Sequence, residues 1–337
     1  MPSRSPSPSR APAPGADGDE GGDDRRAGGW MTRMVGLLDR KPASLRTRRV
    51  LVAAAMVVFL AVSIPSLGVL REGQALRPAV LPLLILVTTP LTVLANAAEY
   101  RVMGAVNGHR IAWRDATQLT VLAAVANLLP LPGGVVVRTQ ALRRQGSSTG
   151  RALQANLAAG LAWIACGALA VGALLLTRPT QRLLAVGLLL LAVGLGAAVA
   201  VLLHRAAPGR AAAHLGQLLA IEAGIVAVSA TRVWLAFTLL GFAAQPAQAV
   251  AISGSVIVAA AIGIFPAGLG LREALAGAIA VAVDLPANRA VAATAADRVA
   301  AQVGLALVAG ALALFLRAPA VDEDALDDPA LHPVDLP

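Results

Sequence analysis

Two arginines stand just behind breaks in apolar runs, where a charged side chain needs a partner. The first break lies in NLLPLPGGVVVRTQAL, residues 127–142, where Gly133 and Gly134 interrupt the run and Arg138 follows. An arginine at the centre of a membrane helix costs at least roughly 2.5–3.5 kcal/mol, so it must face a partner or a polar cavity. A helix starting at the glycines would add free N–H groups and partial positive charge. We therefore expect an anion site here, suited to a phosphate.

A second break of the same kind follows, with its arginine 134 positions after the first. It lies in GIFPAGLGLREAL, residues 263–275, where Gly268 and Gly270 precede Arg272 and Glu273. Two interrupted hydrophobic segments at corresponding positions of two halves are the usual sequence sign of a transporter's binding site. The sequence therefore predicts one site near the membrane midplane, built from both breaks, that binds an anionic headgroup.

Three further polar residues in apolar surroundings are candidates for the same site, namely Asn127, Glu222 and Arg232. Each also has a structural interpretation that the sequence leaves open, because buried polar groups join neighbouring helices and buried charges pair with one another. The ion pairs that would only fix the fold are Arg272 with Glu273 or Glu222, and Arg232 with Asp297 or Glu99.

The composition is that of a polytopic membrane protein. Of 337 residues, 57% are hydrophobic and 14% are charged, whereas a soluble domain carries about 25% charged residues. Full spans of roughly 20 residues are predicted over 50–70, 79–98, 152–176, 183–203, 217–242 and 299–316. The basic cluster Arg46, Arg48 and Arg49 before the first span puts the N-terminus in the cytoplasm. Asp297 and Arg298 would then lie at a membrane surface, and the C-terminus in the cytoplasm.

The runs that flank the breaks are too short to cross a bilayer. The run 117–131 has 15 residues and the run 271–283 has 13. Both flanks of the first break are basic, which favours a re-entrant hairpin that enters from the cytoplasm, and the second hairpin would enter from outside. The predicted fold is all-α, with six full transmembrane helices and two re-entrant hairpins in an inverted repeat, its halves about 50–176 and 183–316.

The ends of the chain differ from its apolar middle. Residues 1–29 are rich in Ser, Pro, Gly and Asp, so we predict a disordered tail. Residues 30–49 form a basic segment with a short interfacial helix pattern. The membrane domain is predicted over 50–317, followed by an acidic disordered tail at 318–337.

Several functional classes are not indicated. The sequence contains no HExxH, GxSxG or Walker motif, so we expect no catalytic residues and no enzyme. Cys166 is the single cysteine, and no metal site or cofactor is expected. Basic residues are scattered between the spans rather than gathered in one polar domain, so we expect no nucleic-acid partner.

The two motifs PLPGGVVVR and FPAGLGLRE resemble those of the flippase-like membrane domain of lysylphosphatidylglycerol synthases and their stand-alone relatives, the UPF0104 group. The resemblance covers roughly residues 50–317. The second motif matches the family's Pro-Gly-Gly-Arg-Glu pattern through Pro266 and the residues already named. The first departs from it: family members often have an acidic residue where Val135–Val137 stand here. About 20 residues follow the last span, so we expect no aminoacyl-transferase domain in this chain.

The resemblance implies movement of a lipid with a charged headgroup between leaflets, with membrane lipids as partners. We expect a lipid flippase or transporter in the cell (inner) membrane, acting on a phospholipid or a polyprenyl-phosphate-linked lipid. The alternative is a non-transporting membrane partner, a scaffold for a lipid-modifying or cell-envelope enzyme. A lipid-modifying enzyme and a second copy of the chain are the protein partners that the sequence leaves open.

Overall fold

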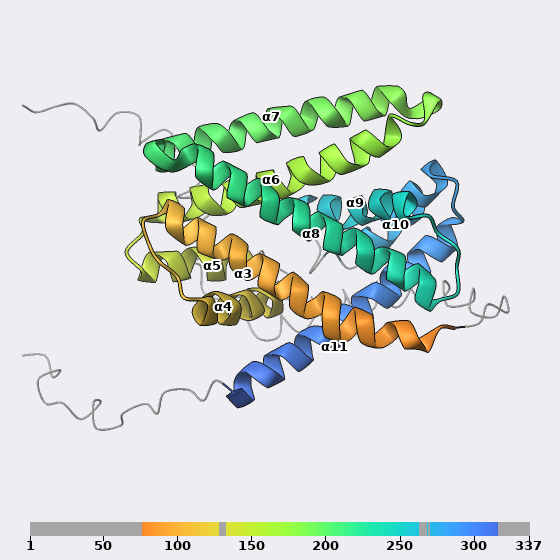
Figure 1. Cartoon of the computed structure of the whole chain (residues 1–337), viewed down its shortest axis with the longest axis horizontal. Helices are drawn as coiled ribbons and strands as arrows, with labels where there is room; N and C mark the ends of the chain where they lie inside the picture. The colour runs from red at the N-terminus through yellow and green to blue at the C-terminus, as the bar shows by residue number, and fades with distance from the viewer. Residues whose placement is uncertain (1–75, 128–132, 263–267, 269, 316–337) are drawn as a thin grey trace, which may run out of the picture. The chain divides into compact units, whose positions relative to one another are not determined.

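A computed structural model describes residues 76–127, 133–262, 268 and 270–315 (Figure 1). The predicted first span, the interfacial segment and both tails lie outside these residues, as do 128–132 and 263–267 within the two breaks. We call the described residues that border these gaps the first tip (Asn127, Gly133 and Gly134) and the second tip (Gly268 and Gly270). Every regular element of the described residues is a helix, and five stretches are long and apolar enough to cross a membrane. The prediction of an all-α protein with several membrane spans is therefore confirmed.

The five long stretches correspond to five of the six predicted spans. They are Pro78–Val106, which ends in α3 (Thr89–Val106), then α6 (Thr149–Leu175), α7 (Arg182–Ala206), α8 (Ala211–Leu239) and α11 (Ala287–Phe315). The last helix begins 12 residues before the predicted span 299–316. Its first part is rich in alanine, a strong helix former, and the structure buries Asp297 and Arg298 in partnerships rather than placing them at a surface.

Four shorter helices flank the two breaks. The first pair is α4 (Trp113–Ala126) and α5 (Gly133–Arg144), with 14 and 12 residues. The second pair is α9 (Pro246–Ile262) and α10 (Leu271–Ala282), with 17 and 12 residues. All four are shorter than the roughly 20 residues that cross a bilayer. Their re-entry into a membrane stays a prediction.

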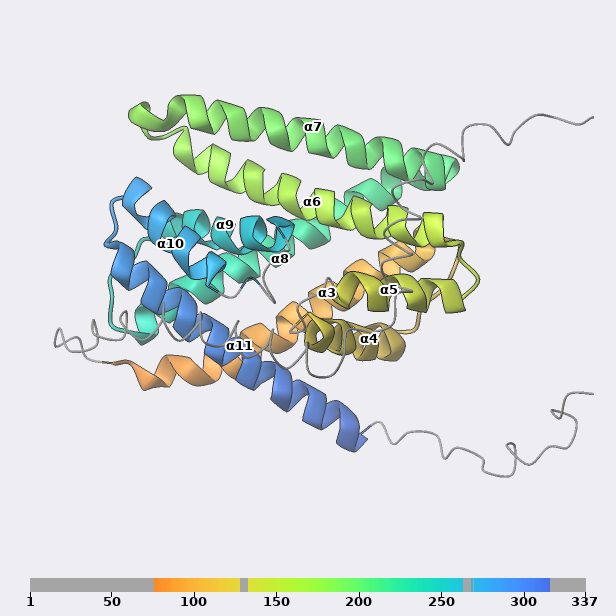
Figure 2. The same cartoon turned by 180° about the vertical axis from the view of Figure 1, so that it is seen from behind.

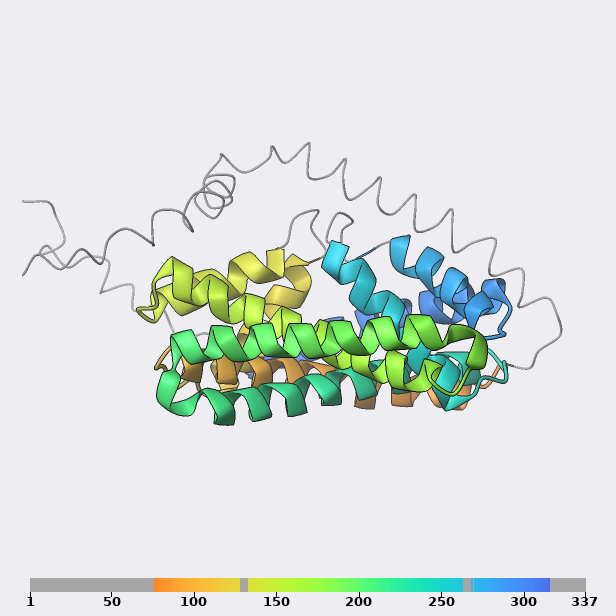
Figure 3. The ribbon, with the colours of Figure 1, turned by 90° about the horizontal axis from the view of Figure 1, so that it is seen from above.

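The same element order occurs twice along the chain. The helices α3, α4, α5 and α6 contact one another in succession, as do α8, α9, α10 and α11, and α3 also packs on α8. Both short pairs lie on the same side of the long helices, one towards each end (Figures 2 and 3). This recurrence is what an inverted repeat would produce, and the inverted repeat stays a prediction.

The open ends of the two short pairs lie near opposite ends of α6. His109 Nε2, before α4, lies 3.0 Å from Ser147 Oγ, just before α6 begins. Gln248, at the start of α9, donates to the carbonyl of Val283 after α10 at 2.9 Å. Arg178, just after α6 ends, pairs with the neighbouring Asp284 at 2.5 Å. The two pairs therefore extend into the helical bundle from opposite directions.

A π-helical turn, Leu83–Thr88, precedes α3, and Pro90 follows at the second position of α3. Proline lacks the N–H that continues a helical hydrogen-bond ladder, which favours such widened turns. The hydroxyls of Thr88 and Thr89 both donate to the carbonyl of Leu84, at 2.7 and 3.2 Å. Neighbouring Ser and Thr side chains commonly satisfy such carbonyls in membrane helices.

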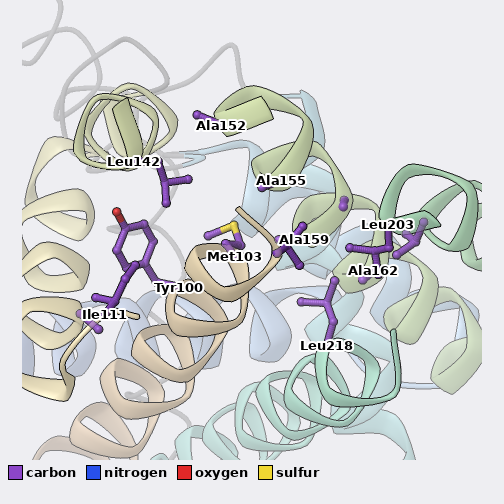
Figure 4. Packing of buried hydrophobic residues seen from close by; sticks show 14 of the residues in the cluster. Tyr100, Met103, Ile111, Leu142, Ala152, Ala155, Ala159, Ala162, Leu203 and Leu218 are labelled. Atoms are coloured by element: carbon purple, nitrogen blue, oxygen red, sulfur yellow. The ribbon is translucent and has the colours of Figure 1, made fainter. Parts of the chain in front are cut away.

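The core that fixes the first pair is built around small residues. Leu142 of α5 and Tyr100 of α3 are buried beside one another, with the alanines of α6 along one side (Figure 4). Small residues let helix backbones approach closely, as in membrane helix packing. The alanines in this core are Ala152, Ala155, Ala158, Ala159 and Ala162.

Candidate functional site

One cavity of about 310 Å³ lies between the two short-helix pairs and the long helices α3, α8 and α11. Both pairs contribute to its wall, α4 and α5 from the first and α9 and α10 from the second. Four of the predicted site residues line it: Asn127, Arg138, Arg232 and Arg272. The structure therefore brings together the two arginines that the sequence places 134 positions apart.

Arg138 reaches from α5 to two acceptors on α3. Its Nη1 donates to Glu99 Oε1 at 2.8 Å, and its Nη2 donates to Asn96 Oδ1 at 3.1 Å. The Arg138 side chain keeps 18% of its surface exposed, while Glu99 keeps 8%. Arg138 is thus held by one carboxylate and one amide, and it still faces the cavity.

Arg232 and Arg272 share one carboxylate on the opposite wall. Arg272 Nη2 donates to Asp297 Oδ2 at 2.6 Å, and Arg232 Nη2 lies 2.8 Å from Asp297 Oδ1. Arg232 also donates to the hydroxyls of Thr88 and Thr89, at 3.1 and 3.0 Å. Asp297 therefore neutralises one positive charge while two guanidinium groups lie against it.

The cavity has an excess of hydrogen-bond donors. Three guanidinium groups line it against one lining carboxylate, that of Asp297. Within the described ranges, the buried Arg272 Nε and the buried hydroxyl of Thr120, also on the wall, have no hydrogen-bond partner. Buried donors without partners are costly, and an anion with several acceptor oxygens would satisfy them. The arrangement is therefore suited to bind a phosphate-like group.

The first tip is held by its two glycines and Asn127. Asn127 ends α4, and its Oδ1 accepts a hydrogen bond of 2.7 Å from the N–H of Gly134. A Cβ atom on Gly133 would lie 2.3 Å from the carbonyl oxygen of Ala126, and one on Gly134 would lie 2.6 Å from Asn127 Oδ1. Only glycine permits this approach. The predicted residues Gly133 and Gly134 thus shape the tip, and the described cavity wall does not include them.

The second tip is held by an acidic residue and a buried arginine. Glu273 is 0% exposed; its Oε2 accepts from the N–H of Gly270 at 2.9 Å, and its Oε1 accepts from Arg298 Nε at 2.8 Å. Arg298 also donates to the carbonyl of Gly268 at 3.3 Å. Both glycines have positive φ, +68° and +78°, a conformation that favours glycine. These three residues, Glu273, Gly268 and Gly270, therefore set the backbone conformation at the second tip. Glu273 pairs with Arg298 rather than with Arg272.

Glu222 is buried in α8 and does not line the cavity. The open alternatives between ion pairs are now decided: Arg232 pairs with Asp297, and Arg272 also pairs with Asp297 rather than with a glutamate. Among the described residues, no group of three or more His, Cys, Asp or Glu side chains is arranged to hold a metal ion.

Three residues of the site were not predicted as its members, although Asp297 and Glu99 were considered as ion-pair partners of Arg232 and the pair with Asp297 is present. Asp297 lies on the cavity wall, and Glu99 and Asn96 hold Arg138 from α3. The signal was present for Asp297, because an acidic residue within an apolar run of membrane length marks a buried partner or a site. It was misplaced because the span was predicted to begin at 299, two positions beyond it.

Five membrane-length helices and this charged cavity define a multi-pass α-helical membrane protein. The chain belongs to the family described as lysylphosphatidylglycerol synthase TM region, whose model matches residues 47–310. The match confirms the resemblance carried by the two Pro-Gly motifs, and it indicates a role at the membrane that is related to lipids. No curated protein matches the chain.

Proposed function

We propose that the protein moves a lipid with an anionic headgroup, a phospholipid or a polyprenyl-phosphate-linked lipid, between the leaflets of the cell (inner) membrane. The headgroup would pass through the cavity while the acyl chains stay in the bilayer, and no bond of the lipid would be made or broken. One observation carries the proposal: the guanidinium groups of Arg138, Arg232 and Arg272, from three helices, line a single cavity with one carboxylate.

The existing ion pairs suit reversible binding. A phosphate that enters the cavity would compete with Glu99 for Arg138 and with Asp297 for Arg272, since these carboxylates lie 2.8 and 2.6 Å from the guanidinium nitrogens. A transported group must bind well enough to enter and weakly enough to leave. After release, the carboxylates would pair with the guanidinium groups again, which weakens phosphate binding enough for the group to leave.

The membrane arrangement follows from the same proposal. Both short-helix pairs would be re-entrant, entering from opposite faces and meeting near the midplane in an inverted repeat, with both termini cytoplasmic. Three observations support this arrangement: the short helices, the open ends of the pairs near opposite ends of α6, and the contribution of both pairs to one cavity.

Translocation of headgroup-labelled phosphatidylglycerol in proteoliposomes tests the proposal. Arg138→Ala and Arg272→Ala should each lower the rate roughly tenfold or more, because a charge-assisted hydrogen bond contributes about 1.5–3 kcal/mol. Arg182→Ala, at the exposed start of α7, is the matched control and should leave the rate unchanged. Wild-type rates in both cavity variants would contradict the site. No translocation by the wild-type protein would contradict transport and favour a membrane partner of a lipid-modifying enzyme.

A further inference from the structure

Among the described residues, one buried carboxylate outside the cavity wall is in no ion pair. Glu222, near the middle of α8, is 1% exposed, and its buried Oε1 atom has no hydrogen-bond partner among the residues that the structure describes. Over the described part of the chain, Glu222 is in no ion pair; Arg138, whose charge acts on it, pairs with Glu99. A carboxylate in this position needs an explanation, because unpaired buried charges in membrane helices are costly.

The titratable surroundings of Glu222 come from three helices. It interacts electrostatically with Glu99 of α3, with Arg138 of α5, and with the Cys166 thiol of α6. Of the other helices packed on α8, α9 has no titratable side chain. Asp297 of α11 pairs with Arg232, which lies ten positions after Glu222 in α8. Tyr100 and Arg101 follow Glu99 on α3, and Tyr100 also interacts electrostatically with Arg138. The other titratable groups on elements packed against α8, or next to them, are Arg77, Arg151 of α6, Arg182, His204 and Arg205 of α7, Arg210 and His214 near the start of α8, and Arg289 and Arg298 of α11.

The local charges do not balance. Arg138 Nη1 donates a hydrogen bond of 2.8 Å to Glu99 Oε1, so one carboxylate already neutralises the charge of Arg138. A charged Glu222 would be a second negative charge near the same cation, in surroundings of low dielectric constant. A bound proton removes that charge and gives the carboxyl group an O–H donor, which is how buried acidic groups avoid the cost of ionisation.

We propose that Glu222 is a proton-binding site coupled to anion binding at Arg138. With a proton on Glu222, only Glu99 competes with an incoming anion for the Arg138 guanidinium. Without the proton, a second negative charge opposes the anion. Proton binding and anion binding therefore strengthen one another, and by linkage the effect is reciprocal. The coupling rests on the proposed function, because the anion is taken to be the lipid headgroup. It would let a proton gradient drive the translocation of the lipid.

Infrared spectroscopy of the full chain in lipid nanodiscs tests the proton directly. A protonated carboxyl has a C=O stretching band, shifted in heavy water, that a carboxylate lacks. We expect this band in the wild type at neutral pH, its loss in Glu222→Gln, and a shifted band in Glu222→Asp. The control Asp115→Asn, an exposed acid at the start of α4, should keep the band. No band in the wild type, or an equal band in Glu222→Gln, would overturn the proposal.

Binding of dioctanoyl phosphatidylglycerol, measured by calorimetry from mildly acidic to mildly alkaline pH, tests the coupling. Its phosphodiester keeps one negative charge over this range, so only the protein titrates. The wild-type Kd should rise with pH by about 5- to 150-fold, the usual size of such coupling. Glu222→Gln should bind tightly throughout, and the same pH dependence in Glu222→Gln as in the wild type would refute the coupling.

The two failures are distinguishable. If neither protein binds this lipid at any pH, the anion site and the proposed function are wrong, and the infrared band alone then decides whether Glu222 holds a proton. If binding is found but the band is absent, the anion site stands and the proton site does not.

Discussion

At the scale of single residues, the central feature is a set of arginines that fixed carboxylates neutralise only in part. Asp297 is 2% exposed and serves both Arg232 and Arg272. A buried ion pair adds little net stability when complete, but removing one partner leaves an uncompensated charge behind. Asp297 therefore has two effects, on the stability of the fold and on the charge that the cavity presents to a ligand.

Asp297→Asn should destabilise the protein by about 3–5 kcal/mol, the usual cost of breaking a buried ion pair. The physical reason is that the guanidinium groups of Arg232 and Arg272 would lose the buried carboxylate that they share. Thermal unfolding in detergent, followed by circular dichroism, measures the change. The matched control is Asp284→Asn, whose side chain is 82% exposed in its pair with Arg178 and should change stability by about 0–1 kcal/mol. Equal melting temperatures of the two variants would contradict this role of Asp297.

At the scale of elements, each short-helix pair is closed by a different device. The first uses a side-chain amide, Asn127, and the absence of a Cβ atom at Gly133 and Gly134. The second uses two glycines with positive φ and the buried Glu273–Arg298 ion pair. In both cases the glycines of the tip precede the arginine that lines the cavity by two to five positions, so the motif couples the geometry of the tip to the position of its charge.

Gly134→Ala should loosen the first tip, because the new Cβ would lie 2.6 Å from Asn127 Oδ1 and overpacking costs about 1–3 kcal/mol. Hydrogen exchange should rise within α4 and α5 and change little elsewhere. Gly187→Ala is the control, since no described atom outside the adjoining helix backbone lies within 4 Å of its added Cβ in α7, and alanine there should stabilise the helix. Unchanged hydrogen exchange in α4 and α5 of Gly134→Ala would show that the contact between position 134 and Asn127 tolerates a Cβ atom.

Much of this element order was predictable from the sequence. Apolar length located five of the long stretches, and the Pro-Gly breaks located the short helices, because proline and glycine interrupt helices wherever they occur. Helix ends were less predictable: α11 starts at Ala287, since its internal charges are neutralised by partners on other helices. A sequence pattern carries no information about such partners.

The sequence predicted only part of the site, because it does not show which side chains on other helices are partners. Arg138 and Arg272 followed from the motifs, and both line the cavity. Their carboxylate partners did not follow, because Glu99 is 39 positions from Arg138 and Asp297 is 25 positions from Arg272. Glu222 was grouped with the site on its charge, and Glu273 on its charge and its place in the second motif. The packing shows that Glu222 is set apart in α8 and that Glu273 binds the backbone of the second tip.

At the scale of the whole molecule, entry of the two short-helix pairs from opposite faces requires a defined orientation in the membrane. In a Cys166→Ser background, a cysteine replacing Gln145 should react with an impermeant reagent only from the cytoplasmic side. Cysteines replacing Gln181 or Gln245 should react only from outside. The expectation rests on the basic residues that flank the first pair and on the uncharged connection between α8 and α9. Labelling of Gln145→Cys and Gln245→Cys from one common side would rule out hairpins of opposite entry.

The central claim is that a lipid headgroup occupies the cavity between the two tips, and photo-crosslinking tests it most directly. A photoreactive phenylalanine analogue replacing Leu305, on the cavity wall, should crosslink to phosphatidylglycerol in the otherwise unchanged chain. Adding Arg138→Ala and Arg272→Ala should abolish that crosslink. The same analogue replacing Leu183, 91% exposed on α7, should crosslink lipid in both backgrounds. A crosslink at position 305 that survives the loss of both arginines, or never forms while position 183 reacts, would contradict the account.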